Sequence, residues 1–116
     1  MIVMQIRELD LKELYIAWEL VKEVHTHLGY AAFEDIIYEM RDTHYTMIGI
    51  FEQEELFCYA GVAIETNLYH KRHLCIYELI SRNNVYEYKN MMQEYLEDYA
   101  RMGACAEIIN YPCNTF

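Results

Sequence analysis

The stretch that decides the fold is "LCIYELISRNNVYEYKNMMQEYLEDYARMGACAEIINY", residues 74–111. It opens with an apolar run typical of a buried strand, 74–81, and closes with a second one, 106–111. Between them, apolar residues recur with the spacing of an amphipathic helix, and Gly103 stands where a helix of this kind should end. A strand, a crossover helix and a second strand predict a parallel pair with a right-handed connection.

The residues before this unit predict one more strand and two helices. Residues 2–8 alternate apolar and polar side chains, as a half-buried strand does. Asp10 then offers a side-chain oxygen as a helix N-cap, and Glu13 follows at the spacing of a capping box. The apolar stripe of the first helix is predicted to comprise Leu14, Trp18, Val21, His25 and Leu28, with Gly29 at its end. A shorter helix carrying Phe33, Ile36, Ile37 and Met40 follows.

The middle of the chain predicts a pair of strands. "YTMIGIF" (45–51) and "LFCYAGVAI" (56–64) flank "EQEE", a polar connection of hairpin length. The complete order is therefore β-α-α-β-β-β-α-β. This order predicts an α/β (α+β) fold with a mixed sheet covered by helices. Residues 1–116 are expected to form a single domain, because a chain of this length can bury one core.

Composition limits the partners and the compartment. Hydrophobic residues make up 54% of the chain, and the formal net charge is −10. A negative field of this kind disfavours nucleic acid, whose affinity for proteins comes mainly from phosphate neutralisation. No segment has the apolar length of a membrane span, and the first residues do not form a secretory signal. We therefore expect a cytoplasmic protein that binds neither nucleic acid nor membrane.

The cysteines and histidines carry no diagnostic spacing. Cys58, Cys75, Cys105 and Cys113 form no CxxC motif, so all four are expected to be reduced. Cys58 and Cys75 fall on strands expected to be neighbours, and the sequence leaves their register open. The histidines of "HKRH" (70–73) are expected in a solvated basic loop, and no metal site is predicted, because no acid or thiol stands at a ligand spacing from them.

The strand and helix pattern resembles the GNAT superfamily of acetyl-CoA-dependent N-acetyltransferases. The resemblance rests on "YAGVAIE" (59–65) as third strand, "LCIYELIS" as fourth, and "MMQEYLEDYARMGACAEIINY" (91–111) as third helix and fifth strand. Members of that superfamily continue with a further helix and two strands, so the resemblance implies that this chain lacks them. It also implies that the tyrosine often found on that helix, a general acid, has no counterpart.

The resemblance further implies a pyrophosphate loop of the form R/Q-x-x-G-x-G/A between the fourth strand and the third helix. The corresponding residues here, "SRNNVYEYKN" (81–90), contain no glycine, and Glu87 would add repulsion at the phosphate position. We therefore expect a dismantled site and no cofactor. If coenzyme A (CoA) does bind, the resemblance assigns its contacts to Leu79, Ile80, Ser81, Lys89 and Asn90.

One candidate catalytic residue remains. Glu78 occupies a position in the fourth strand where the superfamily sometimes places a carboxylate that deprotonates the amine. The alternative interpretation is an outward-facing residue of a strand, because an isolated carboxylate is weak support for a catalytic base.

Other residues favour interaction with a protein. The predicted third helix carries the acidic residues Glu87, Glu94, Glu97 and Asp98, which form either a solvated face or a recognition surface. The last strand, with Ile108 and Tyr111, is expected at an open sheet edge, where a second copy or a partner could pair with it as in a dimer.

Two functions from different classes follow. The first, which the missing glycines favour, is a non-catalytic acidic module that binds a protein, of the inhibitor or decoy type. The second is a divergent N-acetyltransferase that transfers acetyl from acetyl-CoA to an amine. A fragment of such an enzyme is a further alternative.

Overall fold

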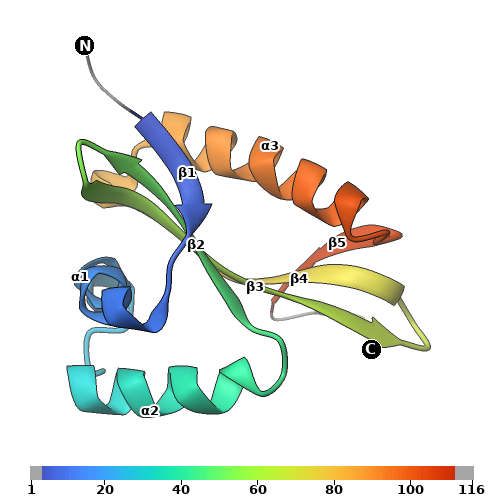
Figure 1. Ribbon diagram of the computed structural model, residues 1–116, viewed down its shortest axis with the longest axis horizontal. Helices are drawn as coiled ribbons and strands as arrows, with labels where there is room; N and C mark the ends of the chain where they lie inside the picture. Colours follow the sequence, from blue (N-terminus) through green and yellow to red (C-terminus); the bar gives the residue numbers. More distant parts are fainter. Residues whose placement is uncertain (1–3, 112–116) are drawn as a thin grey trace.

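The computed structural model describes residues 4–111 and shows three layers, with a five-stranded sheet between helices (Figure 1). The strands are β1 (Met4–Glu8), β2 (Thr46–Glu52), β3 (Glu55–Asn67), β4 (Lys71–Ser81) and β5 (Glu107–Asn110). The helices are α1 (Leu14–Val24), α2 (Tyr30–Arg41) and α3 (Tyr86–Met102), with short 3-10 turns at Leu11–Glu13 and Arg82–Asn84. The predicted order β-α-α-β-β-β-α-β is confirmed.

The strands lie in the sheet in the order of the chain, β1-β2-β3-β4-β5. The first four pair antiparallel, and β5 pairs parallel to β4. The parallel pair requires a crossover, and α3 provides it, as residues 74–111 predict. The sheet is therefore mixed, as expected.

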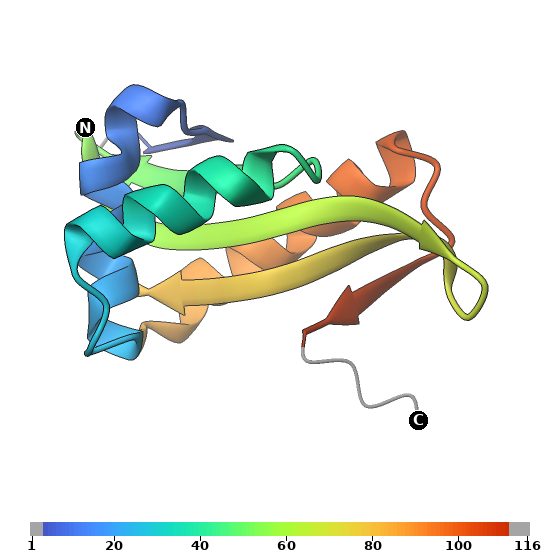
Figure 2. The same ribbon diagram turned by 90° about the horizontal axis from the view of Figure 1, so that it is seen from below.

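Each face of the sheet has its own core. α3 covers one face, and its buried residues Met92 and Leu96 pack there with Ile48, Val62 and others. α1 and α2 cover the opposite face, as Figure 2 shows from below. Both faces of β3 are thus covered, which is why its sequence is apolar without alternation.

The start of the first helical segment agrees with its sequence. Asp10 accepts a hydrogen bond from the N–H of Lys12, and the side chain of Glu13 accepts one from the N–H of Asp10, which completes a capping box. Arg7 binds the same Glu13 carboxylate at 2.7 Å and holds its pKa below the usual value. This bidentate pair ties β1 to the beginning of α1.

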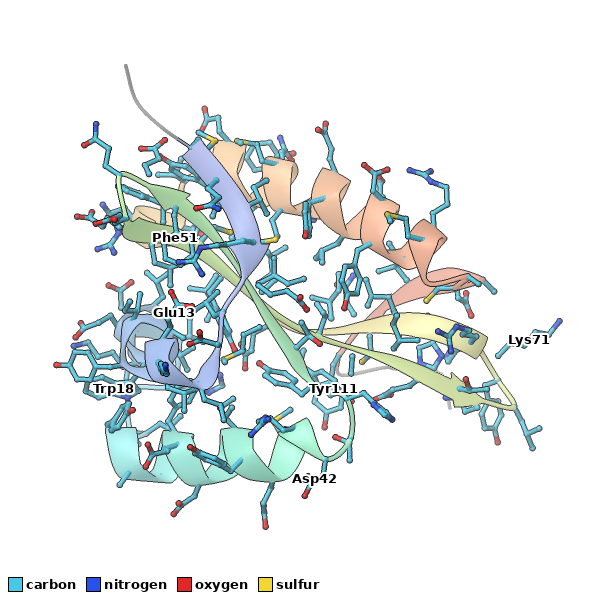
Figure 3. All side chains as sticks on the ribbon, viewed as in Figure 1. Glu13, Trp18, Asp42, Phe51, Lys71 and Tyr111 are labelled. Atoms are coloured by element: carbon cyan, nitrogen blue, oxygen red, sulfur yellow. The ribbon has the colours of Figure 1, made fainter. Side chains whose placement is uncertain are left out.

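The end of the first helix differs from the prediction. α1 stops at Val24, and Gly29 is the N-cap of α2 instead of the end of α1. His25 leaves the helix with ψ at 72°, so it does not continue the apolar stripe. The chain turns here because contacts between segments outweigh the helical spacing. Trp18 donates a hydrogen bond to the carbonyl of Leu28, and both side chains pack, partly buried, against the core on the α1 and α2 side. Figure 3 shows Trp18 on the side of α1 toward α2.

The register separates the two cysteines that could have formed a bridge. Cys58 lies opposite Ser81, whereas Cys75 lies opposite Ala63. Cys58, Cys75 and Cys105 are all outside disulfides, and Cys113 is beyond the described residues. Between residues 4 and 111, no helix combines the length and the hydropathy required to span a bilayer. The cytoplasmic location stays a prediction.

The outer edge of β5 is the feature on which the predicted self-association depends. β5 is the last strand of the sheet, and Tyr111 beyond it is 59% exposed. Ile108, by contrast, packs partly against the core under α3. Its side chain is therefore less available to a partner than the sequence suggested.

Gly61 offers a test of the packing between β3 and the start of β2. A Cβ at this position would overlap the Tyr45 hydroxyl and lie 2.5 Å from its Cζ atom. Gly61→Ala should therefore lower the free energy of unfolding by about 1–3 kcal/mol, the usual cost of overpacking. Urea denaturation measures the change. In the control variant Gly29→Ala the new Cβ meets nothing within 4 Å, so a loss as large as that of Gly61→Ala would contradict the explanation.

Pairing through β5 predicts a dimer that a single proline disrupts. Tyr111 donates its N–H to the carbonyl of Ile76 at 2.8 Å, so the N–H of Asn110 points to the outer edge. Asn110→Pro removes this donor and leaves the β4 side intact. Light scattering at tens of micromolar should give a dimer mass for the unmodified chain and a monomer mass for the variant. A monomer mass for both proteins would refute the pairing.

Candidate functional site

A bulge in β4 determines which side chains point to the α1 and α2 face. Gly61 pairs with Glu78 and Val62 pairs with Ile76, so Tyr77 is an extra residue in β4. Because of this extra residue, Tyr77 and Glu78 both line a cavity on that face. Bulges of this kind re-aim side chains and often accompany functional sites.

The cavity opens where β4 and β5 separate. β5 pairs only with residues 73–76 of β4. Beyond them, residues 77–81 of β4 have no β5 partner within the described part of the chain. The strand there keeps its hydrogen bonds to β3 on one side and offers backbone groups on the other.

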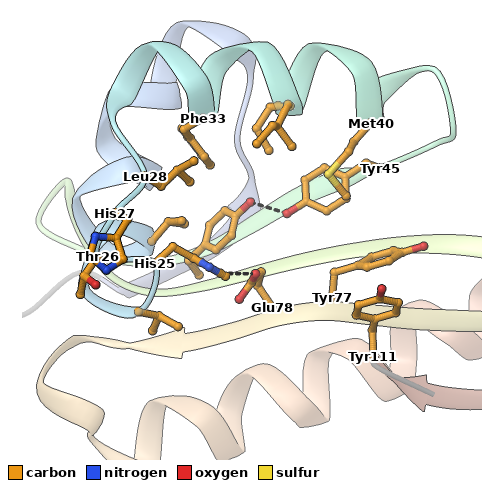
Figure 4. A pocket seen from close by; sticks show the side chains of 15 residues that line it. His25, Thr26, His27, Leu28, Phe33, Met40, Tyr45, Tyr77, Glu78 and Tyr111 are labelled. Atoms are coloured by element: carbon orange, nitrogen blue, oxygen red, sulfur yellow. Dashed lines mark hydrogen bonds and ion pairs between the residues drawn. The ribbon is translucent and has the colours of Figure 1, made fainter. Parts of the chain in front are cut away.

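The cavity has a volume of about 600 Å³, which is in the range of small-molecule sites. Its walls come from the α1–α2 connection, α2, the start of β2, and the separating strands (Figure 4). Its apolar and aromatic lining residues are Val21, Val24, Leu28, Phe33, Ile36, Ile37, Met40, Tyr45, Tyr59, Tyr77 and Tyr111. The other lining residues are His25, Thr26, His27 and Glu78.

Among residues 4–111, Glu78 is the one carboxylate that lines this cavity. Its Oε1 atom lies 2.6 Å from Nε2 of His25, across the space between β4 and the end of α1 (Figure 4). The Glu78 side chain is 28% exposed and that of His25 is 44% exposed. Glu78 therefore faces the cavity, and its role as a catalytic base stays a prediction.

Two buried tyrosines add a hydrogen-bonded pair of hydroxyls to the cavity lining. The hydroxyls of Tyr45 and Tyr59 lie 2.7 Å apart, and burial raises the pKa of each. Two hydroxyls hold two protons, and one of these protons makes the bond between them. The second proton is left for a group in the cavity. Sequence reasoning missed this pair, because the two residues are 14 apart and no motif joins them.

Two asparagines in the segment before α3 adopt a backbone conformation that usually favours glycine. Asn83 has φ at 53° and Asn84 has φ at 56°, both in the left-handed region. Asparagine enters this region more readily than other residues that carry a Cβ. The absence of glycine from 81–90 therefore does not by itself exclude the required turn.

The beginning of α3 also lacks its own acceptors. Val85 is the N-cap, and no side chain accepts from the N–H groups of the first turn. Nearby, the Ser81 hydroxyl is buried and has no hydrogen-bond partner among the described residues. Unsatisfied donors of this kind suit an anion, whose charge the helix dipole also favours.

The charged side chains around the start of α3 differ in their effect on a bound anion. Arg82 donates to the carbonyl of Leu56 at 2.6 Å and 3.1 Å, so its charge is engaged by the protein itself. Lys89 donates to the side chain of Asn84 at 2.8 Å and stays beside the turn. Glu87 is exposed in the first turn of α3 and opposes an anion, as expected.

The donor set fits the phosphates of CoA. Backbone N–H groups at the start of α3, the side chains of Asn83 and Asn84, and Lys89 would hold them. Of the contacts that the resemblance implied, Ser81 and Lys89 lie at this end of the fold. Leu79 packs against the core under α3, and Ile80 belongs to the core under α1 and α2. Asn90 is an exposed residue of α3. The expected absence of a cofactor stays a prediction.

The acidic residues of α3 form an exposed face. Glu87, Glu94, Glu97 and Asp98 are all exposed. Asp98 forms an ion pair with Arg101, and its charge is thereby partly neutralised. The sequence placed these residues correctly, and their interaction with a partner stays a prediction.

The histidines near the β3–β4 hairpin are not a solvated loop. His73 is only 3% exposed, and Nδ1 of His70 lies 2.7 Å from Glu107 on β5. The predicted loop is shorter in the structure, because β3 extends to Asn67 and β4 begins at Lys71, beyond the predicted strand ends. From residue 4 to residue 111, no group of histidine, cysteine or acidic side chains could hold a metal ion.

Comparison with solved structures shows the GNAT acetyltransferase fold. An aminoglycoside N-acetyltransferase in complex with CoA is similar with a TM-score of 0.81 at 11% identity, over 98% of this chain and 80% of that chain. A GNAT family acetyltransferase from Staphylococcus aureus gives 0.79 at 9% identity, over 96% and 87%. A Trypanosoma brucei acetyltransferase gives 0.77 at 13%, over 97% and 84%. No protein-family profile and no curated protein matches the sequence.

The reactivity of two cysteines tests how α3 packs against the sheet. Burial raises the pKa of Cys58 to about 12, whereas Cys105 is only partly buried. Because the thiolate is the reactive form, iodoacetamide at pH 8 should modify Cys105 well before Cys58. Mass spectrometry of peptides from native protein measures each site separately. Equal rates at the two cysteines would show that β3 is not covered as described.

Proposed function

We propose that this protein is an N-acyltransferase that moves an acetyl group from acetyl-CoA to an amine. The observation that carries the proposal is the position of Glu78. It is the one carboxylate of the cavity, it lies where β4 leaves β5, and it contacts His25 at 2.6 Å. The fold supports the proposal, because acetyltransferases of several kinds share it.

Glu78 has the surroundings of a general base. An amine is protonated near neutral pH and must lose a proton before its nitrogen can attack a carbonyl. Glu78 Oε2 would accept this proton directly or through one water, while Oε1 stays with His25. His25 would hold the carboxylate in place through Oε1, and the protonated Glu78, whose side chain is 28% exposed, would release the proton to solvent, from which the departing CoA thiolate would take one.

The cofactor would supply the activated acyl group as a thioester. The protein would hold its phosphates at the first turn of α3, with Asn83, Asn84 and Lys89. Backbone groups of residues 77–81, which have no β5 partner in the described chain, would orient the rest of the molecule.

A second candidate function is a protein-binding module of the inhibitor or decoy type. The observation that favours it is the exposed acidic face of α3, with Glu87, Glu94 and Glu97 along one helix beside Tyr86, which is 70% exposed. Tyrosine is enriched at protein interfaces, and an acidic face would attract a partner with a basic surface. This function needs neither Glu78 nor the cavity.

Glu78→Gln separates the two functions. The variant keeps the shape of the side chain and loses the base. We expect acetyl-CoA to bind both proteins equally by calorimetry. The release of free CoA in the presence of a panel of primary amines should fall about 10²–10⁴-fold in the variant. The matched control Glu39→Gln changes an exposed carboxylate of α2 outside the cavity and should keep full activity.

Two outcomes would count against the enzyme. One is the absence of acetyl-CoA binding in both the unmodified protein and Glu87→Gln, which removes the opposing charge and should otherwise tighten binding. The other is equal turnover by Glu78→Gln and the unmodified protein. Either result would leave the acidic module as the surviving function.

A further inference from the structure

We infer that the acceptor is a primary monoamine on an apolar, ring-bearing body, bound in the cavity of Glu78. This inference rests on the proposed function and names its substrate class. It follows from three properties of the cavity: its charge, its walls and its aromatic side chains.

The charge of the cavity suits one ammonium group. Of the described residues in its lining, Glu78 is the sole carboxylate, and the other ionisable groups are imidazoles and phenols. A second ammonium on the same ligand would find no second carboxylate and would lie near His25 or His27. The exposed acids of the chain are elsewhere, on α3 among other places. The cavity therefore favours a single positive charge over a polycation.

The walls suit an apolar body. Val24 is 56% exposed and Ile36 is 44% exposed, and both lie at the cavity. Large aliphatic side chains left in water at the mouth of a pocket mark a surface that a ligand covers. Burial of apolar ligand surface against these side chains is favourable, so an aliphatic or aromatic body gains affinity here and a polyol does not.

The aromatic side chains favour a ring and a cation. The rings of Tyr77 and Tyr111 have centroids 5.2 Å apart at the point where β4 and β5 separate. Figure 4 shows both rings on the same side of the cavity as Glu78. Faces of tyrosine attract an ammonium group and pack well against another ring. Together with Glu78 they place the amine near the strands and the body toward α2.

Calorimetry without acetyl-CoA tests the inference apart from catalysis. The probes are 2-phenylethylamine, its alcohol analogue 2-phenylethanol, and 1,4-diaminobutane. We expect 2-phenylethylamine to bind at least ten-fold more tightly than either of the others. The alcohol lacks the charge for Glu78, and the diamine lacks the apolar body.

Two isoleucine variants locate the binding. Ile36→Lys places a positive charge, which repels the ammonium group, at the cavity mouth. It should weaken binding of 2-phenylethylamine at least ten-fold. Ile16→Lys changes a comparably exposed isoleucine of α1 outside the cavity and should leave it unchanged. Circular dichroism confirms that both variants are folded.

The outcomes are distinct from those of the proposed function. Amine binding with this pattern and no turnover of acetyl-CoA would support the class of amine ligand and refute the enzyme. Turnover with 1,4-diaminobutane in preference to 2-phenylethylamine would support the enzyme and refute the acceptor class. Equal binding of the three probes, or no effect of Ile36→Lys, would also overturn the inference.

Discussion

The bulge in β4 is the constraint on which the site depends. One extra residue, Tyr77, stands opposite the step from Gly61 to Val62, and it shifts every later side chain of β4 relative to β3. Without it, strict alternation would place Tyr77 and Glu78 on opposite faces of the sheet. With it, both reach the cavity. Gly61 is part of the same arrangement, because Tyr45 occupies the space where a Cβ would be.

The separation of β4 from β5 follows from the short parallel pair. β5 has four residues, and its partners on β4 end at Ile76, immediately before the bulge. β4 and β5 are thus paired near the β3–β4 hairpin and separated beside the cavity. The same strand therefore has two parts: residues 73–76 pair with β5, and residues 77–81 have no β5 partner in the described chain.

The segment before α3 shows how one backbone shape can be reached by different residues. Glycine is the usual residue at positive φ, but Asn83 and Asn84 hold that conformation here. The sequence therefore looked incompatible with an anion site, while the backbone and the uncapped helix are compatible with one. The charge of Glu87 remains the feature that opposes it, and it is a property of the side chain and not of the fold.

The sequence by itself determined the order of elements, the parallel unit at 74–111, the capping box of Asp10 and Glu13, and the end of α3 at Gly103. These depend on periodicity and on local hydrogen bonds, which neighbours in the chain provide. Only the tertiary structure decided where α1 ends, that His25 meets Glu78 from 53 residues away, that the hydroxyls of Tyr45 and Tyr59 form a hydrogen bond, and that Cys58 and Cys75 lie apart. Strand register and bulges fix these contacts, and neither is encoded in the spacing of residues along one segment.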